Sequence, residues 1–198
     1  MNKTTLPAPV QIGDATLYCG DCLDILPTLG KGDETQAWDK AIEQQHINAM
    51  TECSKYQIFW GANYYSDLLP RSKQMFVWNK GIRNMHFNDC EIAWCSGWRE
   101  ASRMFDLTPS GLKKEHPTQK PLNLMRWCIG RLPETAQTIL DPFMGSGTTG
   151  VACAKLGRKF IGIELDPKYF EIACKRIQQA YDEPDLFIEP PAKAVQED

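Results

Sequence analysis

Long apolar runs are absent from this sequence of 198 residues. No stretch reaches the roughly 18 consecutive apolar residues that a membrane-spanning helix needs, so we expect no membrane partner. Residues 1–7 also lack the apolar core of a secretory signal. With 42% hydrophobic and 24% charged residues, the composition is typical of an ordinary globular protein, and we expect a cytoplasmic one.

Paired metal-ligand motifs are also missing, although the chain has eight cysteines. Cys19 and Cys22 form one C-x-x-C, and no second pair follows at the spacing of a zinc site. The three histidines, His46, His86 and His116, are not spaced as metal ligands either. We therefore expect free, mostly buried thiols in a reducing compartment, and no metal.

A large excess of positive charge is lacking too, because the formal net charge is −3. The charge is unevenly distributed: residues 71–120 hold nine Lys or Arg against five Asp or Glu. Residues 182–198 hold six acids and one lysine. A basic middle and an acidic end are compatible with a surface that faces nucleic acid, and also with ordinary solvated faces.

The length fits one domain with a full hydrophobic core, which we place at residues 1–181. The acidic, proline-containing residues 182–198 are expected to form a tail with little structure. Apolar runs bounded by Gly, Pro or Asn predict strands at residues 15–19, 56–60, 74–78, 91–95, 138–140 and 159–164. Apolar periodicity predicts helices at residues 23–26, 41–53, 121–129, 148–156 and 167–181. The polar, basic segment 96–115 has no clear period and is expected at the surface.

The clearest pattern is a strand, a glycine-rich turn, a helix, a strand and a helix in the last third of the chain. Residues 145–150 (Gly-Ser-Gly-Thr-Thr-Gly) satisfy G-x-G-x-x-G, a pattern that also occurs in purely structural turns. Glu164 follows Asp141 by 23 residues, close to the spacing of about 20 at which an acid meets ribose hydroxyls. The pattern predicts a βαβ unit in an α/β fold with a doubly wound, mostly parallel sheet and a ligand at the strand ends.

Three segments together resemble one family. Residues 141–148 (Asp-Pro-Phe-Met-Gly-Ser-Gly-Thr) are similar to the motif D-P-F-x-G-S-G-T of S-adenosylmethionine-dependent DNA amino-methyltransferases. Residues 116–121 (His-Pro-Thr-Gln-Lys-Pro) resemble that family's H-P-T-Q-K-P, and residues 20–22 (Gly-Asp-Cys) its N-terminal G-D-C/S segment. The order of the motifs is that of the family's β group, a circularly permuted arrangement of a Rossmann-like methyltransferase fold.

The resemblance implies S-adenosylmethionine as cofactor and assigns its site residue by residue. Glu164 and Asp21 would accept hydrogen bonds from ribose and adenine, and Phe143 would offer an aromatic face. Lys120 and Thr118 would hold the methionine carboxylate. The complete set of expected cofactor residues is Asp21, Cys22, His116, Thr118, Lys120, Asp141, Phe143, Gly145, Ser146, Gly147, Thr148 and Glu164.

The family's catalytic motif, an acid or asparagine followed by two prolines and an aromatic, has no counterpart in this sequence. It would follow residue 29, where the chain instead reads Leu-Gly-Lys-Gly-Asp-Glu-Thr. The catalytic residues are therefore unknown. Either the chain is a catalytically inactive remnant, or a stretch of a normal enzyme is omitted. The second explanation is favoured because the absent strand would lie beside residues 138–140 at the sheet centre, where its loss leaves ladder groups unpaired.

The resemblance implies methyl transfer to the exocyclic amino group of a flipped base in double-stranded DNA, with adenine as the expected base and a place in restriction–modification. Arg99, Arg103, Lys113 and Lys114 are candidates for DNA contacts, and an ordinary polar loop explains them equally well. A homodimer is compatible with the sequence. A nicotinamide or flavin oxidoreductase is the other alternative, but it predicts a glycine loop near the N-terminus and a second domain.

Overall fold

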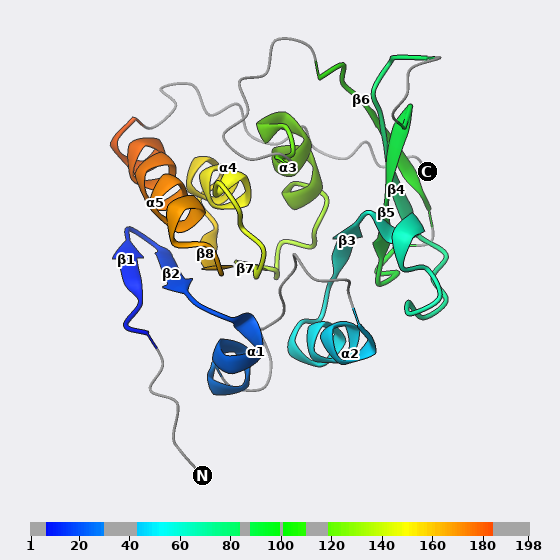
Figure 1. Cartoon of the computed structure of the whole chain (residues 1–198). Coiled ribbons are helices and arrows are strands. Elements are labelled where there is room, and N and C mark those ends of the chain that lie inside the picture. Colours follow the sequence, from blue (N-terminus) through cyan, green and yellow to red (C-terminus); the bar gives the residue numbers. More distant parts are fainter. Residues whose placement is uncertain (1–6, 30–42, 84–87, 100, 110–118, 184–198) are drawn as a thin grey trace.

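The computed structural model describes residues 7–29, 43–83, 88–99, 101–109 and 119–183. Within these residues the strands form two four-stranded sheets, which lie side by side with helices packed around them (Figure 1). We call the sheet with strand order β1-β2-β8-β7 the first sheet, and the sheet with order β3-β5-β4-β6 the second sheet.

The first sheet contains the predicted βαβ unit and joins the two ends of the chain. Its strands are β1 (Val10–Ile12), β2 (Ala15–Cys19), β8 (Lys159–Glu164) and β7 (Thr138–Asp141). The pairs β2–β8 and β8–β7 are parallel, and β1 pairs antiparallel with β2. In the register of β2 with β8, Ala15 lies beside Phe160 and Cys19 beside Glu164.

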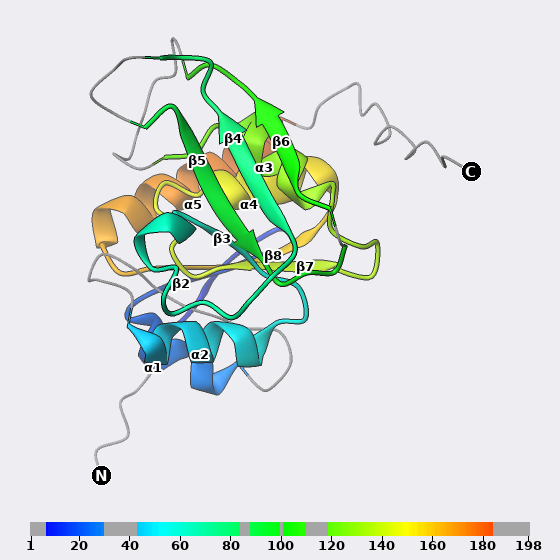
Figure 2. The same ribbon diagram turned by 90° about the vertical axis from the view of Figure 1, so that its right-hand side faces the viewer.

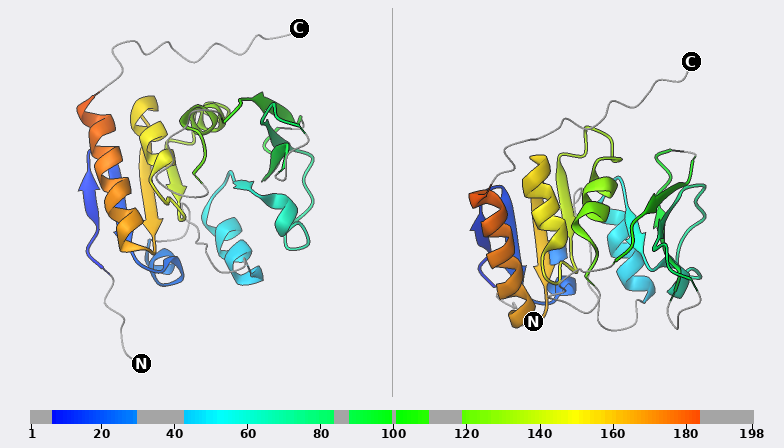
Figure 3. Two further views of the ribbon diagram at one scale, coloured as in Figure 1. Left: turned by 45° about the horizontal axis from the view of Figure 1, so that its top comes forward. Right: turned by 90° about the horizontal axis from the view of Figure 1, so that it is seen from above.

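Helices cover both faces of the first sheet, as a doubly wound fold requires. On one face, α4 (Thr148–Leu156) and α5 (Pro167–Asp182) bury their apolar sides against β2 and β8. On the other face, the short helix α1 (Cys22–Ile25) and the 3₁₀ turn η1 (Leu26–Thr28) pack against β8. The two views of Figure 3 show α4 and α5 side by side along the sheet.

The second sheet is built mainly from antiparallel pairs. Its strands are β3 (Ile58–Trp60), β5 (Cys90–Cys95), β4 (Met75–Asn79) and β6 (Arg103–Asp106). β5 pairs antiparallel with both β3 and β4, and β6 is parallel to β4. Helix α2 (Gln44–Cys53) precedes β3, and the 3₁₀ turn η2 (Ala62–Tyr64) follows it. Figure 2 shows this sheet standing in front of the helices of the first one.

Helix α3 (Leu122–Ile129) connects the two sheets through its two apolar sides. Leu124 and Cys128 are buried in a cluster with Phe76 of β4, whereas Ile129 belongs to the cluster of the first sheet. Pro121 was predicted in the first helical turn, but it is the extended N-cap residue that precedes Leu122. The mixed apolar pattern of this helix therefore reflects burial on two sides.

The predicted α/β class is confirmed, but the expectation of one mostly parallel sheet is wrong for the described residues, which form two mixed sheets. The reason is that β5 returns antiparallel between β3 and β4, so this half cannot join a parallel array. The strands β1 and β6 were not predicted, and β6 lies within the segment 96–115 that was expected to be irregular. Of the predicted tail, only residues 182 and 183 are described.

No helix of the described residues is both long enough and apolar enough to cross a membrane. The same part of the chain has no group of three or more His, Cys, Asp or Glu side chains that could hold a metal ion. Its cysteines are all free, and four of them are buried: Cys22, Cys95, Cys128 and Cys153.

Candidate functional site

The carboxyl ends of three neighbouring strands bring three predicted acids to one edge of the first sheet. Asp21 follows β2, Glu164 ends β8 and Asp141 ends β7. The N–H of Gly20 donates to the carbonyl of Glu164 at 3.0 Å, which fixes the turn carrying Asp21 beside β8. Because parallel strands end at the same edge, this is where an α/β fold places its ligands.

Backbone groups orient the carboxylates of Glu164 and Asp21 at this edge. Glu164 Oε2 accepts from the N–H of Gly145 at 2.9 Å, and its Oε1 accepts from the N–H of Asp166 at 2.9 Å. Asp21 Oδ1 accepts from the N–H of Leu23 at 2.9 Å, so Asp21 also caps helix α1. An ionised carboxylate has about four acceptor positions, so one such group can accept from several donors.

The carboxyl edge of the first sheet has a negative electrostatic potential, which affects the pKa of a nearby thiol. Burial raises the pKa of Cys19 above its ordinary value, and the carboxylates of Glu164 and Asp166 raise it further. A negative potential disfavours the thiolate because like charges repel. The same potential favours hydroxyl donors, amino donors and cations, because it attracts positive charge. The edge is therefore chemically suited to a ligand that donates hydrogen bonds.

Asp141 has a different environment, because its carboxylate closes the glycine loop. Its carboxylate accepts a hydrogen bond from the hydroxyl of Thr149, and its Oδ1 another from the N–H of Phe143 at 3.0 Å. Burial raises the pKa of Asp141, while these two bonds and the charge of Lys120 lower it. The carboxylate thus ties the end of β7 to the first turn of α4.

The glycine loop, residues 145–147, is shaped by left-handed backbone and by close packing. Gly147 has φ of 77°, and a Cβ there would lie 2.9 Å from the Cβ of Ala173 on α5. Ser146 and Thr148 are buried, and both accept hydrogen bonds from Arg176 of α5, at 2.8 Å on Ser146 Oγ and 3.3 Å on Thr148 Oγ1. These two hydroxyls are therefore engaged with the protein itself.

Arg176 is a functional residue that the sequence analysis missed. Its guanidinium also donates to the carbonyl of Ser146, so it contacts the loop at three oxygens. The only available signal was its position three residues after Ala173, which places it towards the inward face of the predicted helix. A single arginine in an amphipathic helix gives no motif.

Lys120 is held in place by Glu91, a second residue that the sequence did not single out. Lys120 Nζ lies 2.9 Å from Glu91 Oε2, and Lys80 Nζ lies 3.0 Å from Glu91 Oε1. Burial alone would raise the pKa of Glu91, but the two ammonium groups hold it below its ordinary value. This ion triad joins the second sheet to the start of α3.

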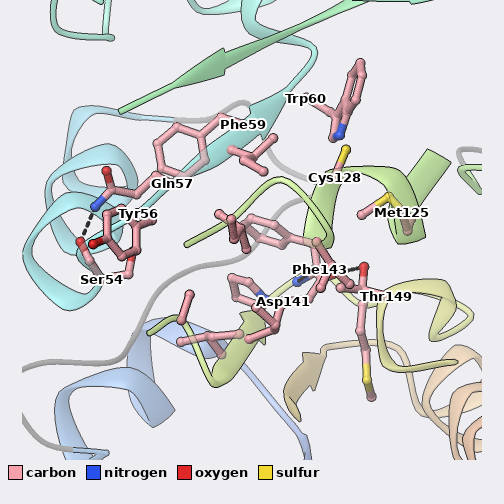
Figure 4. A pocket seen from close by; sticks show the side chains of 18 of the residues that line it. Ser54, Tyr56, Gln57, Phe59, Trp60, Met125, Cys128, Asp141, Phe143 and Thr149 are labelled. Carbon is pink, nitrogen blue, oxygen red and sulfur yellow. Dashed lines mark hydrogen bonds between the residues drawn. The ribbon is translucent and has the colours of Figure 1, made fainter. Parts of the chain in front are cut away.

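A cavity of about 620 Å³ opens between the glycine loop, helix α3 and strand β3. Figure 4 shows Phe59 and Trp60 on the β3 side, Met125 and Cys128 on α3, and Asp141 and Phe143 across from them. Six of the predicted cofactor residues line it: Lys120, Asp141, Phe143, Gly145, Ser146 and Thr148. Glu164 contacts the glycine loop through the N–H of Gly145, whereas Asp21 is placed beside β8 by the turn at Gly20.

Among the remaining predicted residues, Cys22 is fully buried in the cluster of α1 and β8 and does not line the cavity. The others fall into two groups. His116, Thr118, Lys113 and Lys114 lie outside the described residues. Arg99 and Arg103 are exposed and lie near Arg131, whose pKa is lowered by burial and by the charges of Arg103 and Arg99. This arginine cluster is at the carboxyl end of α3, whereas Lys120 precedes its amino end, so about 12 Å of helix separates the two.

The comparison with protein families matches a DNA methylase model, N6/N4 type, over residues 31–175. The chain therefore belongs to the N6/N4 DNA methylase family. It is 30% identical over 148 residues to the type II methyltransferase M2.LlaDCHI of Lactococcus lactis subsp. cremoris, an alignment that covers 70% of this chain and 54% of that relative. It is 41% identical over 85 residues to M.HinfI of Haemophilus influenzae, covering 40% of this chain and 24% of that relative.

The alignments thus span about half the length of the Lactococcus relative, and less of the Haemophilus one. Among solved structures, the complex of M1.HpyAVI with S-adenosylmethionine has a TM-score of 0.62 at 27% identity, covering 82% of this chain and 98% of that one. The PvuII cytosine-N4-specific DNA methyltransferase has a TM-score of 0.66 at 17% identity, covering 91% and 95%. These likenesses agree with the family assignment and with the α/β fold.

Proposed function

We propose that this chain binds S-adenosylmethionine at the edge formed by Asp21, Glu164 and the glycine loop, and that it serves methyl transfer to an amino group of double-stranded DNA. The observation that carries the proposal is that two separate sequence motifs, at Asp21 and at residues 141–148, follow β2 and β7, the two parallel strands that flank β8. Membership of the N6/N4 DNA methylase family and the S-adenosylmethionine complex of M1.HpyAVI support the choice of cofactor.

The residues present fit this cofactor by their donor and acceptor chemistry. Glu164 and Asp21 carry carboxylate acceptors, which match the hydroxyl and amino donors of adenosine. The negative potential at Cys19 suits a sulfonium cation, and the ammonium of Lys120 suits a carboxylate. S-adenosylmethionine, when bound, supplies the electrophilic methyl group.

The chain's own contribution in this proposal is binding and orientation. Glu164 and Asp21 would fix the sugar and base of the cofactor. The glycine loop, which Arg176 and Asp141 hold in place, would set the distance between the cofactor and the cavity. Phe143 lines that cavity and would present an aromatic face to the cofactor. No catalytic residue is assigned, because the acid, two prolines and aromatic of the family motif have no counterpart in the sequence.

Adenine is the proposed target base, and the proposal rests on the family resemblance rather than on a described residue. The PvuII neighbour is cytosine-specific by its name, so a direct assay must separate the two bases. Arg99 and Arg103 would contact phosphates that flank the target, since their cluster lies about one helix length from the cofactor edge. A role in restriction–modification is proposed from the type II relatives.

The experiment is an incubation with methyl-labelled S-adenosylmethionine and unmethylated genomic DNA, with cofactor binding measured separately by calorimetry. Label in N6-methyladenine would support the full proposal, and label in N4-methylcytosine would overturn the choice of base. Cofactor binding without label would favour the inactive remnant. Absence of binding would overturn the cofactor site. A Glu164→Gln variant should weaken binding about tenfold, because a charged acceptor is lost.

A further inference from the structure

An aromatic cluster lies beneath the arginine cluster at the carboxyl end of α3. Phe76 of β4 contacts Trp98 and Trp127 edge-on, with ring centroids 6.0 Å and 4.8 Å apart. Phe105 of β6 also contacts Trp127, with ring centroids 5.3 Å apart. Phe76 is buried in the core of the second sheet, and the other three rings pack against that core. The aromatic cluster therefore gives fixed positions to the residues attached to it.

Arg131 is stacked on this aromatic cluster. Its Cζ atom lies 4.4 Å from the centre of the Trp127 ring, and its carbonyl accepts from Nε1 of Trp98 at 3.3 Å. A planar guanidinium that stacks on an aromatic face keeps its N–H donors in its own plane, where a ligand can still reach them. Within the described part of the chain, the Nε atom of Arg131 is buried without a hydrogen-bond partner.

The other two arginines of the cluster approach Arg131 from the second sheet. Arg99 directly follows Trp98, and Arg103 begins β6. Because side chains alternate along a strand, Arg103 lies on the same face of β6 as Phe105, which is the face that contacts α3. Burial lowers the pKa of Arg131, and the charges of Arg103 and Arg99 lower it further, so the three cations are close enough to repel one another.

The positive charge of this cluster is not offset by the protein. Among the residues that the structure describes, no carboxylate forms an ion pair with Arg99, Arg103 or Arg131. The groups that shift the pKa of Arg131 include no carboxylate either. Placing three guanidinium groups together costs free energy that a bound anion would recover. Phosphate suits them best, because two parallel N–H groups of a guanidinium can donate to two of its oxygens.

We propose that Arg131 is the central residue of a phosphate-binding site, which holds a backbone phosphate of double-stranded DNA while Arg99 and Arg103 contact the phosphates beside it. The choice of DNA rests on the function proposed above, whereas the site rests on the three arginines. Contacts of this kind position a duplex without reading its sequence. The site lies at the opposite end of α3 from Lys120, so the phosphate and the cofactor would not compete.

The first test compares Arg131→Gln with Lys175→Gln, which removes one positive charge from an exposed position of α5. With a fluorescein-labelled duplex, measured by anisotropy, Arg131→Gln should weaken binding about tenfold. The slope of log K against log salt should fall by about 1, because one phosphate contact is lost. Arg131→Lys keeps the charge and loses the planar fork, so its affinity should be intermediate. Equal affinities and slopes for Arg131→Gln and Lys175→Gln would overturn the proposal.

A measurement on the unaltered chain keeps the proposal falsifiable if Arg131→Gln folds poorly. The Nε–H signal of Arg131, identified in heteronuclear NMR spectra by its absence from Arg131→Lys, should shift with inorganic phosphate and not with chloride at equal ionic strength. The duplex should shift the same signal. No shift with inorganic phosphate would overturn the site.

The same spectra separate this proposal from the proposed function. A duplex that binds without shifting the Arg131 signal would overturn the phosphate site and leave the proposed function standing. Absence of any duplex binding would overturn the proposed function. If inorganic phosphate still shifted the signal in that case, DNA would be replaced as the source of the phosphate by a small phosphate-containing ligand.

Discussion

Single residues decide how the candidate site is held, and Glu91 illustrates this most directly. It is the one carboxylate between Lys80 and Lys120, and the side chains of the three residues are 13–24% exposed. Removal of its charge would leave two partly buried ammonium groups close together without a counter-charge. Such a site loses both a strong hydrogen bond and a favourable Coulomb interaction.

We expect Glu91→Gln to lower the free energy of unfolding by about 1–3 kcal/mol at pH 7, as measured with urea. Because the pKa of Glu91 is lowered in the folded state, its contribution is complete above its unfolded value of 4.5 and is lost as pH falls through the folded value. The difference between variant and unaltered chain should therefore shrink below about pH 4. Glu171→Gln, an exposed site on α5, should show no comparable loss at either pH.

Arg176 gives the second prediction for a single residue. Arg176→Gln should raise the dissociation constant for S-adenosylmethionine about tenfold, because the glycine loop loses three contacts that fix its shape. Calorimetric titration measures this directly. The neighbouring exposed Lys175→Gln serves as control, and equal affinities for both variants would contradict the positioning role of Arg176.

At the scale of secondary-structure elements, the contact between α4 and α5 depends on Gly150. A Cβ at this position would lie 2.5 Å from Ile177 Cδ1 and 2.7 Å from Phe160 Cε1. The third glycine of the pattern thus allows the helix to approach both its neighbour and β8. Alanine would normally stabilise a helix interior by about 1 kcal/mol, and here overpacking opposes that gain.

Gly150→Ala should therefore destabilise the protein by about 1–2 kcal/mol in urea unfolding, despite its better helix propensity. Adding Ile177→Val should recover part of the loss, because it removes the nearest methyl group. Gly157→Ala is the matched control: φ is 63° there and nothing lies within 4 Å of the new Cβ, so only backbone strain is tested. A stabilised Gly150→Ala variant would refute the close-packing explanation.

The sequence predicted the elements of the first sheet well because several signals agreed there. The strand at 159–164 and the helix at 148–156 have the bounds that were predicted, and Gly157 ends that helix in the left-handed conformation. β1 and β6 were missed because each is only three or four residues long and lies at the outer position of its sheet. Glu91 and Arg176 were missed because their partners lie 11 to 30 residues away, which no local pattern reveals.

At the scale of the whole molecule, charge and topology set what the chain can contact. Two separate sheets with α3 packed against both could not be anticipated, because antiparallel β5 has the same apolar composition as a parallel strand. The sequence showed that residues 71–120 are basic. It did not show that their cations form two separate groups in the structure. Lys120 lies in the ion triad near the cofactor edge, whereas Arg99 and Arg103 lie near Arg131 at the other end of α3.

Replacing Arg99 and Arg103 together by glutamine should weaken binding to double-stranded DNA and reduce its salt dependence. If each contacts one phosphate, the slope of log K against log salt should fall by about 2 in total. Cofactor affinity should be unchanged, since the cluster is remote from the glycine loop. Anisotropy with a labelled duplex at several salt concentrations gives the slope, and an unchanged slope would place the DNA-contacting surface elsewhere.

The register of β2 with β8 also has a consequence for the order in which the molecule is made. Ala15 is synthesised 145 residues before its partner Phe160. Until then β2 has only the short β1 as a neighbour, and the apolar side chains of Leu17 and Ala15 have no core to enter. Pairing of residues so distant in the chain is slow to close. The first sheet can therefore be completed only after β8 has been made, and we expect β2 to be a site of chaperone binding until then.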